Sequence, residues 1–139
     1  MKGHMLLFVL LAFLQGPASG IPVKMLEGGT ESQIEEPHQL TARTAEEWAK
    51  LWREHAGERA RPSVDFSRDM VVGVFLGSRP TAGFGVQIVS TRVDRGALVV
   101  QYRETRPPGG SITAQVLTSP YQLVTLPKRA GEIRFEKIE

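Results

Sequence analysis

The sequence predicts a small α+β domain: an antiparallel β-sheet or sandwich of about five or six strands, covered by one N-terminal amphipathic helix. Three observations predict this fold. One segment has helical spacing of its apolar residues, several later segments have strand patterns, and Gly/Pro-rich turns separate those strands without further helices. The 139 residues, 41% hydrophobic and 23% charged, fit one globular domain.

The first 20 residues have the pattern of a secretory signal peptide. Lys2 gives a positive start, Met5–Leu14 is an unbroken apolar run, and Ala18 and Gly20 are small residues at the −3 and −1 positions of a cleavage site. An apolar run of this length is about half of what a transmembrane helix needs. We therefore expect residues 1–20 to be removed and the mature protein to be exported (periplasm, cell envelope or medium), with no transmembrane anchor left after cleavage.

Residues 21–39 and 40–139 differ in pattern. The first range contains Pro22, Gly28-Gly29 and several glutamates without sustained periodicity, which predicts a flexible linker. The second range contains all the periodic segments, and it predicts the folded domain.

The helix is expected from Thr44 to about His55. Thr44 and Glu47 form a Thr-x-x-Glu capping box, and Gly57 ends the helix. Trp48, Leu51 and Trp52 lie at i, i+3 and i+4 and so share one face. Two tryptophans can form a ligand platform, but this spacing favours a hydrophobic anchor that packs the helix on a sheet.

The strands follow the helix in order. An unbroken apolar run at 70–77 predicts a strand buried on both faces, whereas alternation at 84–88 and 97–104 predicts half-buried strands. Further strands are expected at 113–117, 121–126 and 133–138. Because no helix separates these segments, we expect antiparallel pairing.

The residue inventory argues against catalysis and against bound metals or cofactors. The chain has no cysteine and only three histidines, and no nucleophile elbow or phosphate-binding glycine loop is present. We expect His55 to interact with the helix dipole as a C-terminal residue and not to act as a base. One enzymatic alternative stays open, in which Asp65 or Asp69 serves a hydrolase. We expect no deep polar cavity with converging ionisable side chains.

The charge distribution is uneven but not concentrated. Residues 71–139 hold 9 basic and 5 acidic side chains, which are scattered among turns. A scattered basic surface is typical of solvated loops, and export makes nucleic acid a poor partner. We therefore expect no binding to nucleic acid.

Two loops combine proline, glycine and side chains suited to contact with another protein. They are Arg79–Phe84 and Arg106–Gly110. Prolines reduce the entropy lost on binding, and arginine and aromatic side chains supply contact energy. Plain turn geometry explains the same residues, since Pro80 fixes φ and Gly83 permits a bend.

Several of these segments resemble the C-terminal domain of the PrcB family, a subunit of a bacterial surface protease complex that contains a subtilisin-like protease. The resemblance is carried by Val64–Phe66, Met70–Gly77, Arg79–Ile88 and Gln115–Val124, and also by Glu47–Trp52 upstream. It covers about residues 42–126 and implies a non-catalytic partner of a protease. Arg79–Phe84 is also similar in composition to the binding loop of chagasin-type protease inhibitors.

The sequence departs from the family pattern at two places. Ala82 stands where the family usually has a second glycine, and Phe84 replaces a tyrosine, so a contact through that hydroxyl is absent. The founding member is a lipoprotein, and this signal region has no cysteine to modify. Membrane anchoring is therefore not implied.

Together these patterns predict an exported, non-enzymatic domain that binds a protein partner, such as a secreted or envelope protease. The expected binding residues are Arg79, Pro80, Thr81, Gly83, Phe84, Arg106 and Tyr121. The alternative is a secreted protease inhibitor with a chagasin-like loop. We expect Arg79→Ala and Thr81→Ala to weaken partner binding while leaving thermal unfolding nearly unchanged, with Phe84 more buried than Arg79 or Thr81.

Overall fold

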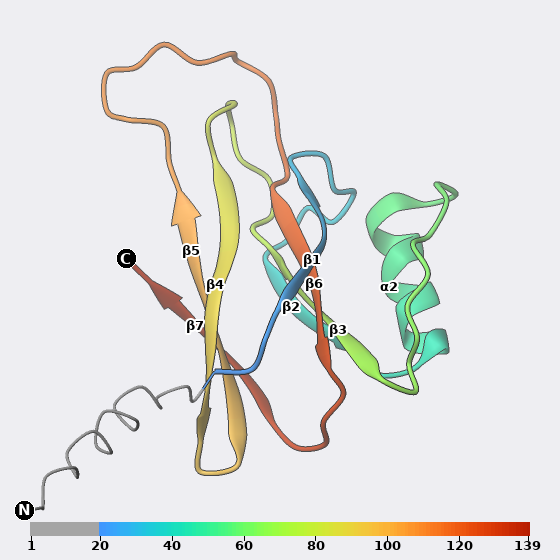
Figure 1. Cartoon of the computed structure of the whole chain (residues 1–139). Helices are drawn as coiled ribbons and strands as arrows, with labels where there is room; N and C mark the ends of the chain where they lie inside the picture. The colour runs from blue at the N-terminus through green and yellow to red at the C-terminus, as the bar shows by residue number, and fades with distance from the viewer. Residues whose placement is uncertain (1–19) are drawn as a thin grey trace, which may run out of the picture.

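A computed structural model of the chain describes residues 20–139, and the predicted signal peptide therefore lies outside the described residues except for Gly20. Seven strands form two sheets, with one helix on the outer side of the larger sheet (Figure 1). The elements are β1 (Lys24–Gly29), β2 (His38–Ala42), α2 (Ala45–Ala56), β3 (Asp69–Phe75), β4 (Gly85–Asp94), β5 (Ala97–Thr105), β6 (Tyr121–Pro127) and β7 (Ile133–Ile138).

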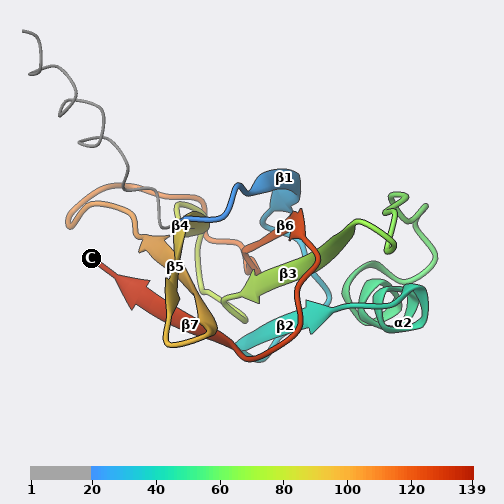
Figure 2. The ribbon, with the colours of Figure 1, turned by 60° about the horizontal axis from the view of Figure 1, so that its bottom comes forward.

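The larger sheet has the order β1-β6-β3-β2, and all of its pairs are antiparallel. Its central strand β3 is buried on both faces, as the apolar run predicted. Val71 and Phe75 belong to a core cluster with α2, whereas Met70, Val72 and Val74 belong to a cluster shared with the smaller sheet. Figure 2 shows the resulting order of helix, larger sheet and smaller sheet.

Helix α2 begins and ends close to the predicted residues. The Thr44 hydroxyl accepts a hydrogen bond from the Glu47 N–H at 3.1 Å, and Gly57, with φ of 62°, donates to the Arg53 carbonyl. Trp48 and Trp52 are both 2% exposed, and their indole N–H groups donate to the Pro62 and Arg59 carbonyls. The tryptophans are thus the predicted hydrophobic anchor.

The structure is mostly β, with seven strands in two sheets and one short helix, which fits the α+β class, but four details differ from the prediction. Both β1 and β2 precede α2, so the helix is not the first element of the described chain. Strand β1 lies within residues 21–39, where we predicted a flexible linker. It pairs with β6 at the edge of the sheet, with a register shift between Met25 and Glu27 that hides the strand alternation. The domain boundaries themselves stay a prediction.

The smaller sheet has the order β4-β5-β7, and the other two differences concern this sheet and the connection that leaves it. Strands β5 and β7 are parallel, contrary to the expected antiparallel pairing, because the chain crosses to the larger sheet as β6 before it returns. Residues 113–117, predicted as a strand, form no regular structure. They lie in the connection between β5 and β6, which rises above the strand tips in Figure 1.

Candidate functional site

Two loops and one buried carboxylate form the most distinctive surface at the upper end of the sheets. We define this loop face as residues 78–84 and 106–118, with Glu104 beneath them. The Glu104 side chain is only 3% exposed, and Arg79 binds one of its oxygens through both Nε and Nη2 at 3.1 Å. Lys137 binds the other oxygen at 3.1 Å, and Arg106 lies 3.7 Å from it.

Glu104 holds the loop face together electrostatically. Burial acts to raise the pKa of Glu104, but hydrogen bonds from Lys137 and Arg79 outweigh burial, and the pKa lies below its usual value. The carboxylate therefore stays ionised at neutral pH. Since three cations surround one buried anion, the face carries excess positive charge, with Arg106 as its most exposed basic group at 67%.

The first loop is shaped by a close contact with the second. Gly83 has φ of 98°, a conformation that side chains rarely adopt, and a Cβ there would lie 2.9 Å from Pro107. The Arg79 guanidinium lies 5.8 Å from the centre of the Phe84 ring, within reach of a cation–π interaction. The positive φ of residue 83 and its closeness to Pro107 together require glycine at this position.

The rest of the long connection lies beside the first loop. Arg79 and Thr118 exchange two backbone hydrogen bonds of 2.7 and 2.9 Å, and the Ala82 N–H donates to the Ala114 carbonyl at 3.0 Å. The Thr118 hydroxyl also donates to the Thr81 carbonyl. These bonds fix residues 114–118 against residues 79–82.

The structure thus brings six of the seven predicted binding residues to one face: Arg79, Pro80, Thr81, Gly83, Phe84 and Arg106. Arg79, Thr81 and Phe84 are all half-buried. Tyr121 lies elsewhere. Its ring packs against His55 and Phe75 in the core beneath α2, because β6 directs it to the helix side of the sheet.

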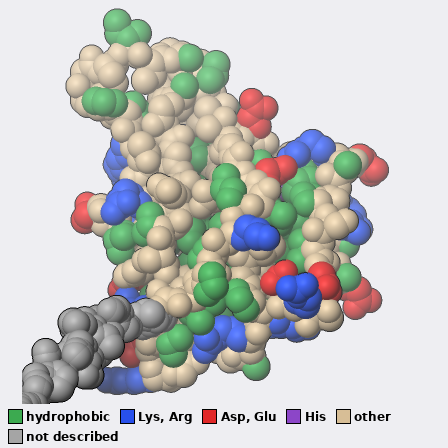
Figure 3. Space-filling view, in the orientation of Figure 1, with side chains coloured by type: hydrophobic (Ala, Val, Ile, Leu, Met, Phe, Trp, Pro, Cys, Tyr) green, Lys and Arg blue, Asp and Glu red, His purple; other side chains and the backbone are tan. Residues whose placement is uncertain are grey.

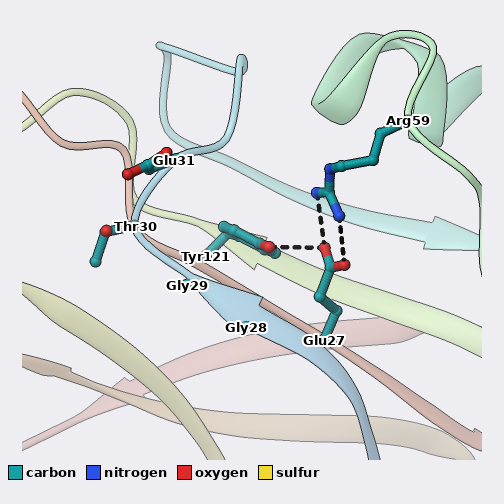
Figure 4. Close-up of a pocket in the computed structure, with 7 residues that line it drawn as sticks. All are labelled: Glu27, Gly28, Gly29, Thr30, Glu31, Arg59 and Tyr121. Atoms are coloured by element: carbon teal, nitrogen blue, oxygen red, sulfur yellow. Dashed lines mark hydrogen bonds and ion pairs between the residues drawn. The ribbon is translucent and has the colours of Figure 1, made fainter.

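Tyr121 belongs to a second polar group, which lines a hollow of about 440 Å³ at the edge of the larger sheet. The Tyr121 hydroxyl donates to Glu27 at 2.6 Å, and Arg59 donates to both Glu27 oxygens at 2.9 and 3.2 Å. Figure 4 shows the Tyr121 and Arg59 side chains converging on the Glu27 carboxylate. We expected no deep polar cavity with converging ionisable side chains; this hollow does bring ionisable side chains together, but it is open to solvent.

The pKa values in this group lie far from those of a neutral-pH acid or base. Burial acts to raise the pKa of Glu27, but hydrogen bonds from Arg59, Tyr121 and His55 lower it to about 2. Burial, together with the bond to Glu27, raises the pKa of Tyr121 to about 12. Burial lowers the pKa of His55 despite its bond to Glu27, so the ring is neutral at pH 7. His55 is therefore not the charged partner of the helix dipole that we predicted.

Ser32, His55 and Glu27 are linked by hydrogen bonds in the sequence serine, histidine, carboxylate, as in the catalytic triad of a hydrolase. Its Nε2 donates to Glu27 at 3.1 Å, which leaves Nδ1 to accept from the Ser32 hydroxyl at 2.8 Å. However, His55 is fully buried, Ser32 is 7% exposed, and the Ser32 oxygen already accepts the Ile34 N–H. Neither Ser32 nor His55 lines the hollow. This arrangement satisfies buried polar groups and leaves no space for a substrate at the hydroxyl.

One of the two carboxylates considered for a hydrolase, Asp65, is engaged within its own turn. Asp65 is exposed and accepts the N–H and hydroxyl of Ser67 within one turn, and these bonds keep the pKa of Asp65 below its usual value. Within residues 20–139, no three His, Asp or Glu side chains are grouped so as to hold a metal ion. No helix in the same range is long and apolar enough to cross a bilayer.

Sequence reasoning missed Glu104 and Glu27, which organise the two polar groups. Glu104 is an isolated acidic residue between Arg103 and Arg106, and this local surplus of arginine is a weak signal of a buried counter-ion. Glu27 lies in the segment interpreted as a linker. Its partners, His55, Arg59 and Tyr121, are distant in sequence, and no local pattern links them.

The architecture is that of a small two-sheet domain in which rigid loops, fixed by a buried carboxylate, form one end. Within this domain, residues 70–127 match the family model PrcB C-terminal, which confirms the family resemblance. The match runs from β3 to the end of β6 and includes the whole loop face. The likenesses at Glu47–Trp52 and Val64–Phe66 lie outside it and stay predictions. No curated protein and no solved structure matches the chain.

Proposed function

We propose that the protein is an exported, non-catalytic subunit that binds a secreted subtilisin-like protease through its loop face. The observation that carries this proposal is the PrcB C-terminal match over residues 70–127, because that range contains both loops and Glu104. The family resemblance supports a role as a protease-complex subunit, and therefore a protein as the partner.

The geometry of the loop face suits binding to another protein. Ion pairs to Glu104, the Gly83–Pro107 contact and the Arg79–Thr118 hydrogen bonds hold both loops in place before any partner arrives. A surface that is already ordered loses little conformational entropy on binding. Arg106 lies 3.7 Å from Glu104 while its side chain stays 67% exposed, as expected of an interface contact.

The test is a binding measurement between residues 21–139 and a secreted subtilisin-like protease whose nucleophilic serine is replaced by alanine. Arg106→Ala is expected to weaken binding about tenfold, because arginines at interface centres often contribute more than 1 kcal/mol. Arg53→Ala, on the exposed side of α2, is the matched control and is expected to leave binding unchanged. Equal affinity for Arg106→Ala and the wild type would contradict the proposed face.

Arg79→Ala, the variant suggested by sequence alone, is a poorer test. Removing Arg79 takes the principal partner from a buried carboxylate, so the variant is expected to lose stability as well as binding. Thr81→Ala removes only a hydroxyl that donates to the adjacent Ala82 carbonyl, and it still serves as a mild probe of the loop.

The non-catalytic part of the proposal is supported by the complete hydrogen bonding of Ser32, His55 and Glu27. We expect the purified protein to hydrolyse neither peptide nor ester substrates. Turnover that disappears in Ser32→Ala or Asp65→Ala would establish an enzyme and overturn this part.

The export part is supported by the signal-peptide pattern of residues 1–20 and by the contacts of the residue that follows. The Ile21 nitrogen lies 2.6 Å from the Thr91 hydroxyl oxygen, and the same hydroxyl donates to the Ile21 carbonyl at 3.0 Å. Cleavage after Gly20 would place the new α-amino group at this acceptor. The test is the N-terminal sequence of the protein recovered from culture fractions, with Ile21 expected as the first residue and an intact Met1 in the cytoplasm contradicting export.

A further inference from the structure

Met25 carries the one sulfur atom of residues 20–139 that solvent reaches. The chain has no cysteine, and Met25 and Met70 are its only methionines after residue 20. Met70 is fully buried in the core between the two sheets, whereas Met25 is 57% exposed on β1, at the edge of the larger sheet. Figure 3, in the orientation of Figure 1, shows hydrophobic side chains at the surface over the lower end of β1. A reagent that attacks sulfur in the folded domain therefore meets Met25 first.

The fold holds the Met25 thioether on two sides. The Gln122 side-chain amide, on β6, donates a hydrogen bond to the Met25 sulfur at 3.2 Å. The methyl carbon beyond the sulfur lies against Gly28, because a Cβ added to Gly28 would come within 2.9 Å of that carbon. A larger residue at position 28 would displace the methyl group. We call Gly28 and Gln122, with the Met25 thioether between them, the thioether seat.

Gln122 is itself fixed at the other end of its amide. Its oxygen accepts the backbone N–H of Ile88, on β4, at 2.6 Å. Strand β4 has a register shift directly after Ile88, and β1 has one between Met25 and Glu27. Gln122 therefore joins the two sheets where both ladders are irregular. Because the amide oxygen is anchored on β4, the amide N–H group points at the sulfur from a fixed direction.

The seat places the two lone pairs of the sulfur in different surroundings. One lone pair accepts the Gln122 N–H, and the sulfur forms no second hydrogen bond within residues 20–139. Peroxide oxidises a thioether by transferring one oxygen atom to a sulfur lone pair. The O–O bond breaks, the sulfur loses two electrons, and the peroxide is reduced to water. The sulfoxide is chiral at sulfur, so the lone pair that reacts determines which epimer forms.

We propose that Met25 is an oxidation site of this protein, at which peroxide forms mainly one sulfoxide epimer because Gln122 occupies one lone pair, and that the product leaves the thioether seat. The oxidised sulfur carries partial positive charge and is a poor acceptor for the Gln122 N–H. The new oxygen lies on the side away from Gln122, and the side chain can present it to the amide only by withdrawing its methyl group from Gly28. Oxidation thus loosens the contact between β1 and β6. This site is separate from the loop face, and the proposal does not depend on the proposed partner.

The first test compares the two methionines in the folded full-length chain. The protein is treated with dilute hydrogen peroxide, and the sulfoxide in peptides that contain Met25 or Met70 is quantified by mass spectrometry. We expect Met25 to be oxidised at least about tenfold faster than Met70, because Met70 is buried. The same peptides from protein oxidised in urea, where both side chains are exposed, give the reference rates. Equal rates in the folded protein would overturn the assignment of Met25 as the site.

The epimer ratio tests the thioether seat. Two methionine sulfoxide reductases, each specific for one epimer, are applied separately to the oxidised Met25 peptide. Attack on the bound lone pair requires the Gln122 hydrogen bond to break first. We therefore expect one epimer in about fivefold excess from the folded protein, and about equal amounts from protein oxidised in urea. Equal amounts from the folded protein would overturn the role of the seat.

Gln122→Glu is the matched variant. At neutral pH a glutamate keeps an oxygen for the Ile88 N–H but has no N–H group for the sulfur. We expect this variant to yield about equal amounts of the two epimers. An excess as large as that of the wild type would show that Gln122 does not direct the reaction. The comparison with urea does not require this variant to fold.

Thermal unfolding tests whether the product leaves the seat. Met25→Leu keeps an apolar side chain of similar volume but has no oxidisable sulfur at this position. Peroxide treatment is expected to lower the unfolding temperature of the wild type by about 3 °C, the effect of losing one weak hydrogen bond, and to leave that of Met25→Leu unchanged. An unchanged unfolding temperature of wild-type protein with Met25 fully oxidised would overturn the release from the seat. An equal fall in both proteins would overturn it as well.

Discussion

Replacing Arg79 by alanine tests whether Glu104 holds the loop face together. The change removes two 3.1 Å contacts to a carboxylate that is 3% exposed, and it leaves Lys137 and the more distant Arg106 as remaining partners. Removing one member of a buried ion pair costs about 3–5 kcal/mol when no other partner remains. Because Lys137 still neutralises Glu104, we expect the free energy of unfolding to fall by about 2 kcal/mol.

Arg106→Ala is the matched comparison. Arg106 is 67% exposed and lies 3.7 Å from the same carboxylate, and exposed pairs contribute less than about 1 kcal/mol. The assay is urea unfolding at pH 7 of both variants, of Glu104→Gln and of the double variant Arg79→Ala/Glu104→Gln. We expect the double variant to lose at least about 1 kcal/mol less than the sum of its single variants, because the pair is counted twice in that sum. Additive losses, or equal small losses for Arg79→Ala and Arg106→Ala, would refute the role of Glu104.

Three further predictions concern other contacts. Acidification should destabilise the protein, because the pKa values of Glu27 (about 2) and of His55 lie below their ordinary values of 4.5 and 6.5. The free energy of unfolding should fall below about pH 6.5, where His55 begins to titrate in the unfolded chain, and fall further below about pH 4.5, where Glu27 does. Glu27→Gln should flatten the lower part of a thermal-unfolding pH profile. In denaturant titrations, Gly83→Ala should lower the free energy of unfolding by about 1 kcal/mol more than Gly96→Ala, because both glycines have positive φ but only Gly83 faces Pro107. Equal losses would show that the contact with Pro107 does not constrain residue 83. Tyr121→Phe should lower the free energy of unfolding by about 1–2 kcal/mol, because it removes the hydrogen bond to Glu27, and it should not weaken protease binding. Weaker binding would show that Tyr121 belongs to the interface after all.

Elements that depend on local periodicity could be predicted from the sequence. The capped helix with Trp48 and Trp52 on one face, and the apolar run that became β3, each carry their signal within one short segment. Strand β1 carries no such signal, since paired glycines and a register shift interrupt its alternation. Its position depends on pairing with β6, almost a hundred residues later in the chain.

Residues 113–117 show the opposite case. Their composition is that of a strand, but a strand also requires a neighbour. The described fold bonds this segment only at Ala114, whose carbonyl accepts the Ala82 N–H. Strand propensity was therefore visible in the sequence, while the lack of a pairing strand was not.

The sequence identified the two loops of the candidate site, but it did not show that they share one buried anchor. Proline and glycine patterns identified Arg79–Phe84 and Arg106–Gly110, which the structure places side by side. Their common anchor, Glu104, is set by long-range ion pairs. Tyr121 was misplaced because alternation along β6 assigns it to the same face as Leu123 but does not say which core lies on that side.

Hydrogen exchange of the protein with and without the inactivated protease tests the central claim most directly. We predict that complex formation slows exchange in residues 106–118 and leaves the amides around the Glu27 hollow unchanged. Protection confined to Gly28–Glu31 and the neighbourhood of Arg59, with residues 106–118 still exchanging freely, would contradict the account.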